Sequence, residues 1–213
     1  MNRLRLTILF LLSLTLCKAQ SDGIHLHGVY FNVGLGASSF YNHSETSSDL
    51  QWSALVGCGK YDSFKDSKFG YRISMQIMTK GAKHLKTHLN DHVTQIRTYF
   101  LEVPFNLNYT FPVSHKYAIE IGAGPFLAVG LNGTIRSDGG EMFKAKISTY
   151  GPFEGMRRFD AGINTVVYFH FHNQFVGLYY DRGFIPFCKY DDMTFPRNKQ
   201  WMLTWGIHIN RIP

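Results

Sequence analysis

The chain has no long apolar segment. No stretch reaches 18 consecutive apolar residues, although hydrophobic residues make up 45% of the 213-residue sequence. A membrane-spanning helix needs about 20 such residues, so the sequence excludes helical spanning. One shorter run, Leu6–Leu16, consists of apolar, Ser and Thr residues between Arg5 and Ala19, a small residue suited to cleavage. This arrangement predicts a signal peptide over residues 1–20 and export of residues 21–213 as one domain.

Cysteine is scarce. Only Cys58 and Cys188 of the three cysteines would remain after cleavage, whereas small exported proteins stapled by disulfides usually contain more. The strand assignment below places these two cysteines at opposite ends of the domain. A disulfide requires Cα atoms within about 7 Å, so we predict none between them. Cys17 would accept a lipid anchor, but Leu16 stands before it where a small residue is expected, which disfavours lipidation.

Charged residues are also few, at 17% of the chain, while aromatic residues reach 15%. Ordinary soluble domains carry about 25% charged residues. The formal net charge of +7 falls to +4 once Arg3, Arg5 and Lys18 leave with the signal. This charge is too small to indicate nucleic-acid binding, but it suits basic loops that contact acidic lipid headgroups.

Apolar and polar residues alternate over Arg97–Phe111. The odd positions from Tyr99 to Phe111 are all apolar or aromatic, and the even positions are mostly polar. A period of two predicts a strand with one apolar and one polar face. In an exported chain, repeated strands of this kind predict an outer-membrane barrel, whose apolar face meets lipid and whose polar face lines the interior.

Seven further stretches show the same alternation. They predict an all-β fold, an eight-stranded antiparallel transmembrane β-barrel with short periplasmic turns and long outer loops. The expected strands are Gly28–Ser38, Leu50–Tyr61, Phe69–Thr79, Arg97–Phe111, Tyr117–Leu131, Arg158–Phe171, Gln174–Asp181 and Gln200–Ile209.

The connections support this assignment independently, because bacterial barrels alternate short periplasmic turns with longer outer loops. The expected turns are Asp62–Lys68, Pro112–Lys116 and His172–Asn173. The expected outer loops are Phe40–Asp49, Lys80–Gln95, Asn132–Met156 and Arg182–Lys199.

Aromatic residues fall near the ends of the expected strands, where barrels carry girdles at the membrane interfaces. The predicted girdle comprises Trp52, Tyr99, Phe111, Tyr117, Trp201 and Trp205. Phe111 and Tyr117 flank a periplasmic turn, as do Phe171 and Phe175, and the other four girdle residues are expected towards the outer end. The alternative is that aromatic residues simply favour strands.

Two prolines, Pro104 and Pro125, lie inside expected strands. Proline has no N–H group to donate to the ladder. Each proline therefore marks either a bulge or a lapse in pairing, and the sequence leaves both possibilities open.

Four short motifs carry a family resemblance. They are Leu101–Phe105 (LEVPF), Gly122–Pro125 (GAGP), Arg158–Gly162 (RFDAG) and Tyr179–Gly183 (YYDRG). With these motifs the chain resembles the bacterial porin-family outer-membrane β-barrel domain, whose members are often described as similar to PorT. The resemblance covers nearly the whole mature chain and implies an eight-stranded barrel mostly without an assigned activity. One type of member assists a protein secretion system, a role that fold alone does not transfer.

Six charged residues are expected to face the interior. They are Arg72, Glu102, Glu120, Arg158, Asp160 and Asp181. An eight-stranded barrel has an interior just wide enough for side chains to fill. Since buried charges need partners, these residues predict a network that plugs the barrel. A narrow ion pathway and an acid–base pair are the alternatives.

The second expected outer loop carries His84, His88 and His92 at a spacing of four residues. On a helix these imidazoles would share a face and would be able to bind zinc or copper. The same loop contains three lysines that would repel a cation, namely Lys80, Lys83 and Lys86. We therefore expect a basic loop that contacts anionic surface glycolipid, with metal capture as the alternative.

The chain contains no G-x-S-x-G elbow and no complete dinucleotide fingerprint, so we expect neither catalysis nor a cofactor. We expect a monomer with a structural or interaction role through its outer loops. Its expected partners are outer-membrane lipid and glycolipid, and envelope or secretion-system proteins. The alternatives are a narrow channel or transporter for small solutes, a secretion accessory, and a soluble barrel that binds an apolar ligand. The soluble form would leave apolar faces in water, at a cost of roughly tens of kcal/mol.

Overall fold

The computed structural model of this chain describes residues 27–41, 47–64, 67–87, 90–114, 116–138, 144–150, 157–187 and 196–209. The predicted signal peptide, His88 and Cys188 lie outside these residues. The strands are β1 (His27–Tyr41), β2 (Ser47–Asp49), β3 (Gln51–Ser63), β4 (Phe69–Thr87), β5 (Asn90–Ser114), β6 (Tyr117–Asp138), β7 (Lys144–Ser148), β8 (Phe159–Phe171), β9 (Gln174–Gly183) and β10 (Arg197–His208). None of the described residues forms a helix long and apolar enough to cross a membrane.

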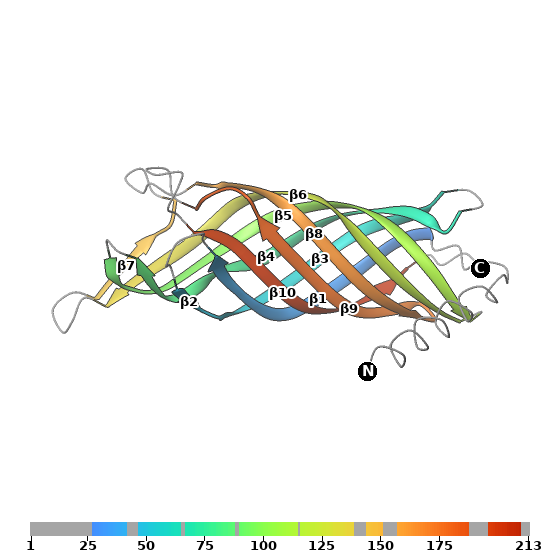
Figure 1. The fold of residues 1–213 in the computed structure, drawn as a ribbon, viewed down its shortest axis with the longest axis horizontal. Coiled ribbons are helices and arrows are strands. Elements are labelled where there is room, and N and C mark those ends of the chain that lie inside the picture. Colours follow the sequence, from blue (N-terminus) through green and yellow to red (C-terminus); the bar gives the residue numbers. More distant parts are fainter. Residues whose placement is uncertain are drawn as a thin grey trace, which may run out of the picture.

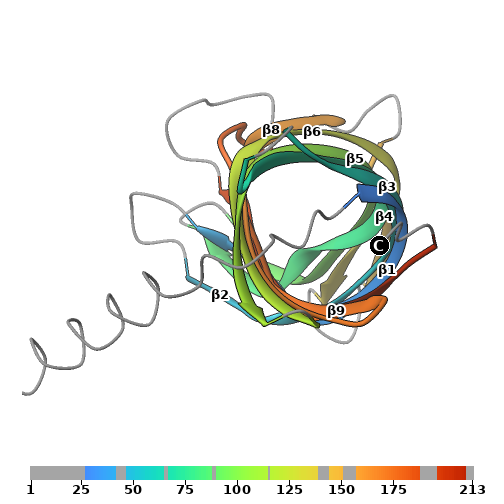
Figure 2. The same cartoon turned by 90° about the vertical axis from the view of Figure 1, so that its right-hand side faces the viewer.

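The eight long strands form one closed antiparallel barrel (Figures 1 and 2). Around the barrel they follow the order β1, β3, β4, β5, β6, β8, β9 and β10, and β10 pairs with β1 to close the ring. The two short strands lie beside this ring, with β2 paired to β4 and β7 paired to β6. The eight-stranded antiparallel barrel predicted from the sequence is therefore confirmed.

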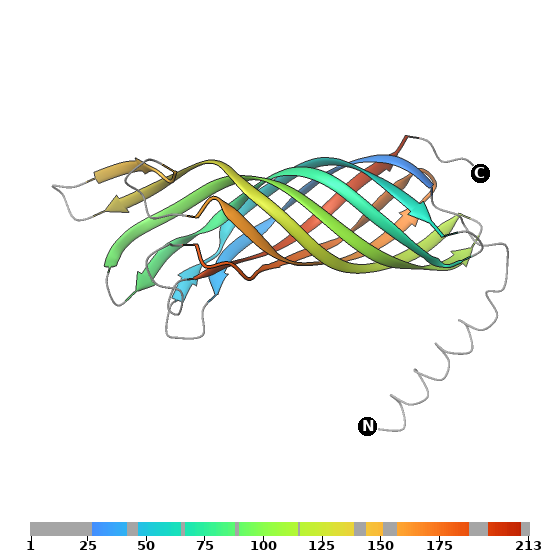
Figure 3. The same ribbon diagram turned by 90° about the horizontal axis from the view of Figure 1, so that it is seen from above.

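Short turns gather at one end of the barrel. β3 is followed by β4, β5 by β6 and β8 by β9 at this end, where β1 also begins and β10 ends (Figure 1). We call it the short-turn end, and it corresponds to the periplasmic side of bacterial barrels. The opposite end, which we call the outer end, carries β2, β7 and the far parts of β4, β5 and β6 (Figure 3).

The strands at the outer end are longer than predicted. The expected loop Lys80–Gln95 is mostly strand, because β4 continues to Thr87 and β5 begins at Asn90. Much of the expected loop Asn132–Met156 likewise belongs to β6 and β7. Backbone hydrogen bonds hold a ladder together wherever two strands run side by side, whereas apolar alternation persists only where one face meets lipid. The alternation of apolar and polar residues therefore stops at a lower height than the strands themselves.

Inward and outward residues alternate as expected. On β5, for example, Asn106 is 2% exposed while its neighbour Leu107 is 58% exposed. Exposed large apolar side chains occur on all eight strands of the barrel, and most buried residues of these strands are polar, aromatic or small. The molecule thus has an apolar exterior and a polar interior, which is the inverse of a soluble protein.

The apolar belt has the height of a membrane. On β5 it runs from Val113 to Leu101, which spans about 40 Å along the strand. At the tilt of about 45° usual for such strands, this length crosses about 28 Å. An outer-membrane barrel needs an apolar band of about 25 Å, so Leu101 lies close to the outer edge of the hydrocarbon.

The two prolines mark lapses in pairing without bulges. Between β4 and β5 the paired residues stop at Ile73–Phe105 and resume in the same register at Gln76–Glu102, which leaves Pro104 unpaired on that side. Between β5 and β6 the pairs likewise skip Pro125 without a shift in register. Each proline pairs with its other neighbouring strand. The missing N–H groups therefore interrupt the ladder on one side only.

Candidate functional site

A first polar layer fills the barrel near the short-turn end, and we call it the Arg72 layer. The Arg72 guanidinium donates from Nε to Glu120 Oε1 at 3.0 Å and from Nη2 to Glu120 Oε2 at 2.7 Å. Asn108 Nδ2 donates to Glu120 Oε1 at 2.7 Å, and His170 Nε2 lies 2.7 Å from Glu120 Oε2. His208 Nε2 extends the chain to His170 Nδ1 at 3.3 Å. The buried Glu120 carboxylate is therefore bound by a bidentate guanidinium, an amide and an imidazole.

Aromatic rings surround the Arg72 guanidinium. Its central carbon lies 4.3 Å from the ring centre of Tyr30, 4.7 Å from Tyr168, 5.0 Å from Phe175 and 5.3 Å from Tyr61. Such faces attract a cation and exclude water from it. Phe175, which was expected to flank a periplasmic turn with the girdle aromatics, is fully buried in this layer. It lies on the inward face of β9, opposite the outward set that includes Leu178.

A second polar layer lies eight residues farther along β4, and we call it the Lys80 layer. Lys80 Nζ lies 2.5 Å from Glu102 Oε2 and 3.6 Å from Asp181 Oδ2. Tyr179 donates its hydroxyl to Glu102 Oε1 at 2.6 Å, and Asn164 donates to Asp181 Oδ1 at 2.8 Å. Lys80 was expected in an outer loop, so its place in the interior is a correction. It follows from the added length of β4.

In the Lys80 layer, carboxyl groups outnumber the cationic side chains that the structure describes. Asp160, the third carboxyl group on this side of the interior, accepts a hydrogen bond from Asn198 Nδ2 at 2.9 Å and is 2% exposed. Glu102 and Asp181 therefore form ion pairs with the Lys80 ammonium, and Asp160 adds a longer-range electrostatic attraction to it. In the Arg72 layer, by contrast, one guanidinium faces one carboxylate.

Arg158 does not belong to the interior, contrary to the prediction. Its side chain is exposed, and Nη2 donates to the Tyr150 carbonyl at 3.0 Å while the guanidinium lies 5.3 Å from the Tyr150 ring. β8 begins only at Phe159, so strand alternation does not set the direction of Arg158. Burial, together with the nearby Asp160 carboxylate, raises the pKa of the Tyr150 phenol.

The residues of the predicted girdle lie on the exterior. Trp52, Tyr99, Tyr117, Trp201 and Trp205 are exposed, and Phe111 is half-buried. Trp201 stacks on Tyr180 with ring centres 4.1 Å apart near the outer end. The expected outer position of Trp205 is wrong, because its indole N–H donates to Gln174 at 3.0 Å, beside the turn that joins β8 to β9.

Of the three histidines of the second expected loop, the two that the structure describes do not lie on a helix. His84 lies in β4 with a φ of 44°, and His92 lies in β5. His84 Nδ1 is 2.9 Å from Asp49 Oδ2, and both side chains are well exposed. Within the described ranges, no three His, Cys, Asp or Glu side chains come together as a metal site. His84 and His92 therefore do not lie on the helical face on which the metal hypothesis depended.

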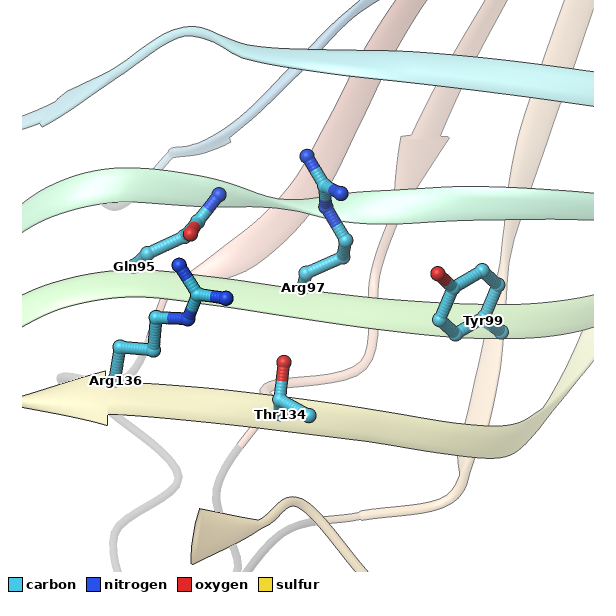
Figure 4. A pocket seen from close by; sticks show the side chains of 5 residues that line it. All are labelled: Gln95, Arg97, Tyr99, Thr134 and Arg136. Carbon is cyan, nitrogen blue, oxygen red and sulfur yellow. The ribbon is translucent and has the colours of Figure 1, made fainter. Parts of the chain in front are cut away.

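A cavity of about 410 Å³ opens on the exterior of β5 and β6 at the outer end (Figure 4), and we call it the rim pocket. It is lined by Gln95, Arg97, Tyr99, Thr134 and Arg136. The pocket was not predicted from the sequence, because Arg97 was taken only as the start of a strand and Arg136 was assigned to a loop. The two arginines can be recognised as neighbours only when β6 is known to continue to Asp138 and to pair with β5.

No protein-family model matches the chain, and no curated protein sequence does either. The solved structures that share its fold include the following two. Neisserial surface protein A (NspA) is 12% identical, covers 85% of this chain with 97% of its own, and has a TM-score of 0.51. The outer membrane enzyme PagL is 11% identical, covers 84% of this chain with 99% of its own, and has a TM-score of 0.52.

At such low identity these likenesses show the fold alone. The closed barrel and its membrane-high apolar belt place the chain in a class, the integral β-barrel proteins of the bacterial outer membrane.

Proposed function

We propose that this protein is a closed, non-enzymatic outer-membrane barrel that acts as a monomer through its outer end. The observation that carries the proposal is the filling of its interior. Two layers of paired charges lie one above the other, and each is built from several strands of the wall. An eight-stranded barrel is narrow enough for such layers to occupy its whole cross-section.

Passage of an ion would require these layers to open. The Arg72 guanidinium is held by two hydrogen bonds to Glu120 and enclosed by four aromatic rings. Lys80 is likewise held by Glu102 and lies 4.4 Å from the Phe126 ring centre. Separating one partner of a buried pair leaves an uncompensated charge in a poorly solvated interior. This cost favours a structural plug over a conducting path.

The non-enzymatic part of the proposal rests on the exposed side chains. PagL is described as an enzyme, so the shared fold does not decide the question. Among the exposed side chains that the structure describes, the His84–Asp49 pair has the arrangement of a catalytic dyad. The adjacent Ser48 hydroxyl is instead bonded to the Phe40 backbone at 3.1 and 3.2 Å. A nucleophile, base and orienting acid are therefore not aligned there.

The outer end offers a firm surface for a partner. The β4–β5 pair and the β6–β7 pair continue beyond the apolar belt as hydrogen-bonded ladders (Figure 3). Such ladders hold their side chains in fixed positions better than irregular loops do. An envelope or secretion-system protein is the proposed partner, in line with the PorT-like resemblance of the sequence.

Narrow cation conduction is the second candidate, because Glu102, Asp160 and Asp181 bring three buried carboxyl groups to the side of the interior where Lys80 lies. The test is the conductance of the purified full-length protein in a planar bilayer. The proposal expects a silent wild type and unitary steps in an Arg72→Ser/Glu120→Ser/Lys80→Ser/Glu102→Ser variant, whose folding is checked by heat-modifiable gel mobility. Cation-selective steps from the wild type would favour the channel and contradict the plug.

A further inference from the structure

A β-bulge changes which side of β6 faces outward. Tyr99 pairs with Asn132 and Phe100 pairs with Gly130, so Leu131 is an extra residue on β6. Below this bulge the odd residues of β6, such as Leu127 and Val129, face lipid. Beyond it the even residues face outward, and Ile135 turns inward to pack against Ile96 and its neighbours. Bulges often re-aim side chains in this way beside functional sites.

The bulge places two arginines on one outward patch. In the register beyond it, Thr134 is opposite Arg97 and Arg136 is opposite Gln95. Arg97 and Arg136 are thus diagonal neighbours, whose Cβ atoms are expected about 7–8 Å apart. Figure 4 shows both guanidinium groups and the Gln95 amide on the same face, with Arg136 reaching towards β5. Two of the five lining residues are arginines and none is acidic, so the lining itself carries positive charge.

The height of the rim pocket matches the lipid headgroups. Leu101 is the last apolar residue of the belt on β5, and Tyr99 follows it towards the outer end. Arg97 lies about 13 Å along the strand from Leu101, which is about 9 Å in height at the usual tilt. The polar region of one leaflet is about 5–8 Å thick, so both guanidinium groups lie at its level or just beyond it.

We propose that the rim pocket binds a phosphate group of a phosphorylated glycolipid in the outer leaflet. Guanidinium groups bind phosphate through paired, charge-assisted hydrogen bonds, and the Thr134 hydroxyl adds a neutral donor, while Gln95 Nε2 donates to Gln51 Oε1 at 3.3 Å. Tyr99 presents an amphipathic ring at the interface, where a sugar or the start of an acyl chain would lie. The acyl chains would then continue down the belt past Leu101 and Val129. The inference rests on the outer-membrane class and is independent of whether the interior conducts.

The test measures binding of diphosphorylated lipid A to the full-length protein folded in a zwitterionic detergent. The variant is Arg97→Gln/Arg136→Gln. The matched control is Arg182→Gln/Lys199→Gln, which removes two cations that face each other across β9 and β10 at the same end of the barrel. Inorganic pyrophosphate is titrated separately, because it offers the same phosphate chemistry without a lipid. Heat-modifiable gel mobility establishes that each variant is folded.

We expect the Arg97→Gln/Arg136→Gln variant to lose at least about tenfold in lipid A affinity, since each charge-assisted bond contributes more than a neutral one. The control should lose less than about threefold, and pyrophosphate should bind at least about tenfold more weakly than lipid A. Equal losses in both variants would show only general surface charge and would overturn the site. Pyrophosphate binding as tight as that of lipid A would overturn the glycolipid assignment. Should the double variant fail to fold, Arg136→Gln alone at this exposed position must still weaken lipid A binding more than Arg182→Gln does.

Discussion

Replacement of Glu120 by glutamine should destabilise the barrel severely. The Glu120 carboxylate faces the buried Arg72 guanidinium at 2.7 and 3.0 Å and also holds Asn108 and His170. Glutamine keeps the volume and part of the hydrogen bonding but removes the carboxylate that, among the described residues, is paired with Arg72. Removing one partner of a buried pair typically costs about 3–5 kcal/mol, so we expect the free energy of unfolding to fall by about that amount.

Urea unfolding in lipid vesicles, followed by tryptophan fluorescence, would measure this loss. The three tryptophans are all exposed on the outside of the barrel, so unfolding moves each of them from lipid to water. An Arg72→Met/Glu120→Gln variant serves as the control, because it removes both charges together. Its cost should be well below the sum of the two single costs, since the charges interact directly.

The Lys80 layer provides an internal comparison for this prediction. After Glu102→Gln, Lys80 retains Asp181 at 3.6 Å, so its charge remains compensated. We therefore expect a loss of only about 1–2 kcal/mol, the scale of a charged hydrogen bond. The reasoning is refuted if Glu120→Gln costs less than about 1 kcal/mol, or if Glu102→Gln is the more damaging change.

Three further predictions are measured by the same unfolding assay. Leu107→Arg on the lipid face should lower the free energy of unfolding by about 2–4 kcal/mol, whereas Asn106→Arg on the inward face should have a different effect that is limited by packing. If Leu107→Arg is tolerated as well as a substitution at an exposed turn site, the assignment of Leu107 to the lipid face is contradicted. Arg158→Ala should change the free energy of unfolding by less than about 1 kcal/mol, because this arginine is exposed. A loss as large as that of Arg72→Ala would contradict the exposed position of Arg158. Gly36→Ala should cost about 1–3 kcal/mol, because its Cβ would meet the Trp201 carbonyl oxygen, whereas Gly34→Ala would first meet the Thr204 methyl group and should cost less.

The barrel was predictable from the sequence because lipid imposes a simple pattern. Every strand that crosses the hydrocarbon must alternate apolar and polar residues, and this pattern located all eight strands and the facing of most of their residues. Where a strand continues outside the hydrocarbon, this alternation is lost and no longer predicts the strand or the direction of its side chains. Lys80 was therefore assigned to a loop, although β4 continues past it and turns its side chain inward. The same limit explains Arg158, which precedes the first residue of β8.

The partners of the interior charges were only partly predictable. Alternation indicated that Glu102, Glu120 and Asp181 point inward, but it did not indicate which charge meets which. Those pairings depend on the stagger between strands far apart in the sequence, such as β4 and β6 for Arg72 and Glu120. The inward position of His170 followed from alternation, but its bond to Glu120 and the aromatic enclosure of Arg72 were not predicted, for the same reason. The inward or outward direction of a side chain follows from the local sequence, whereas its contact partners depend on the register of the closed barrel.

The bulge at Leu131 shows how one extra residue can serve both faces of a strand. Without it, Ile135 would keep the outward facing of the odd residues and Arg136 would point into the apolar cluster formed by Phe40, Ala82, Ile96 and Phe187. That arrangement would bury an unpaired guanidinium and expose an isoleucine beyond the lipid edge, and both changes are unfavourable. The extra residue corrects the mismatch at the height where the surroundings change from hydrocarbon to headgroups. The packing of Ile135 against the apolar cluster inside and the outward position of Arg136 therefore follow from the same shift in register.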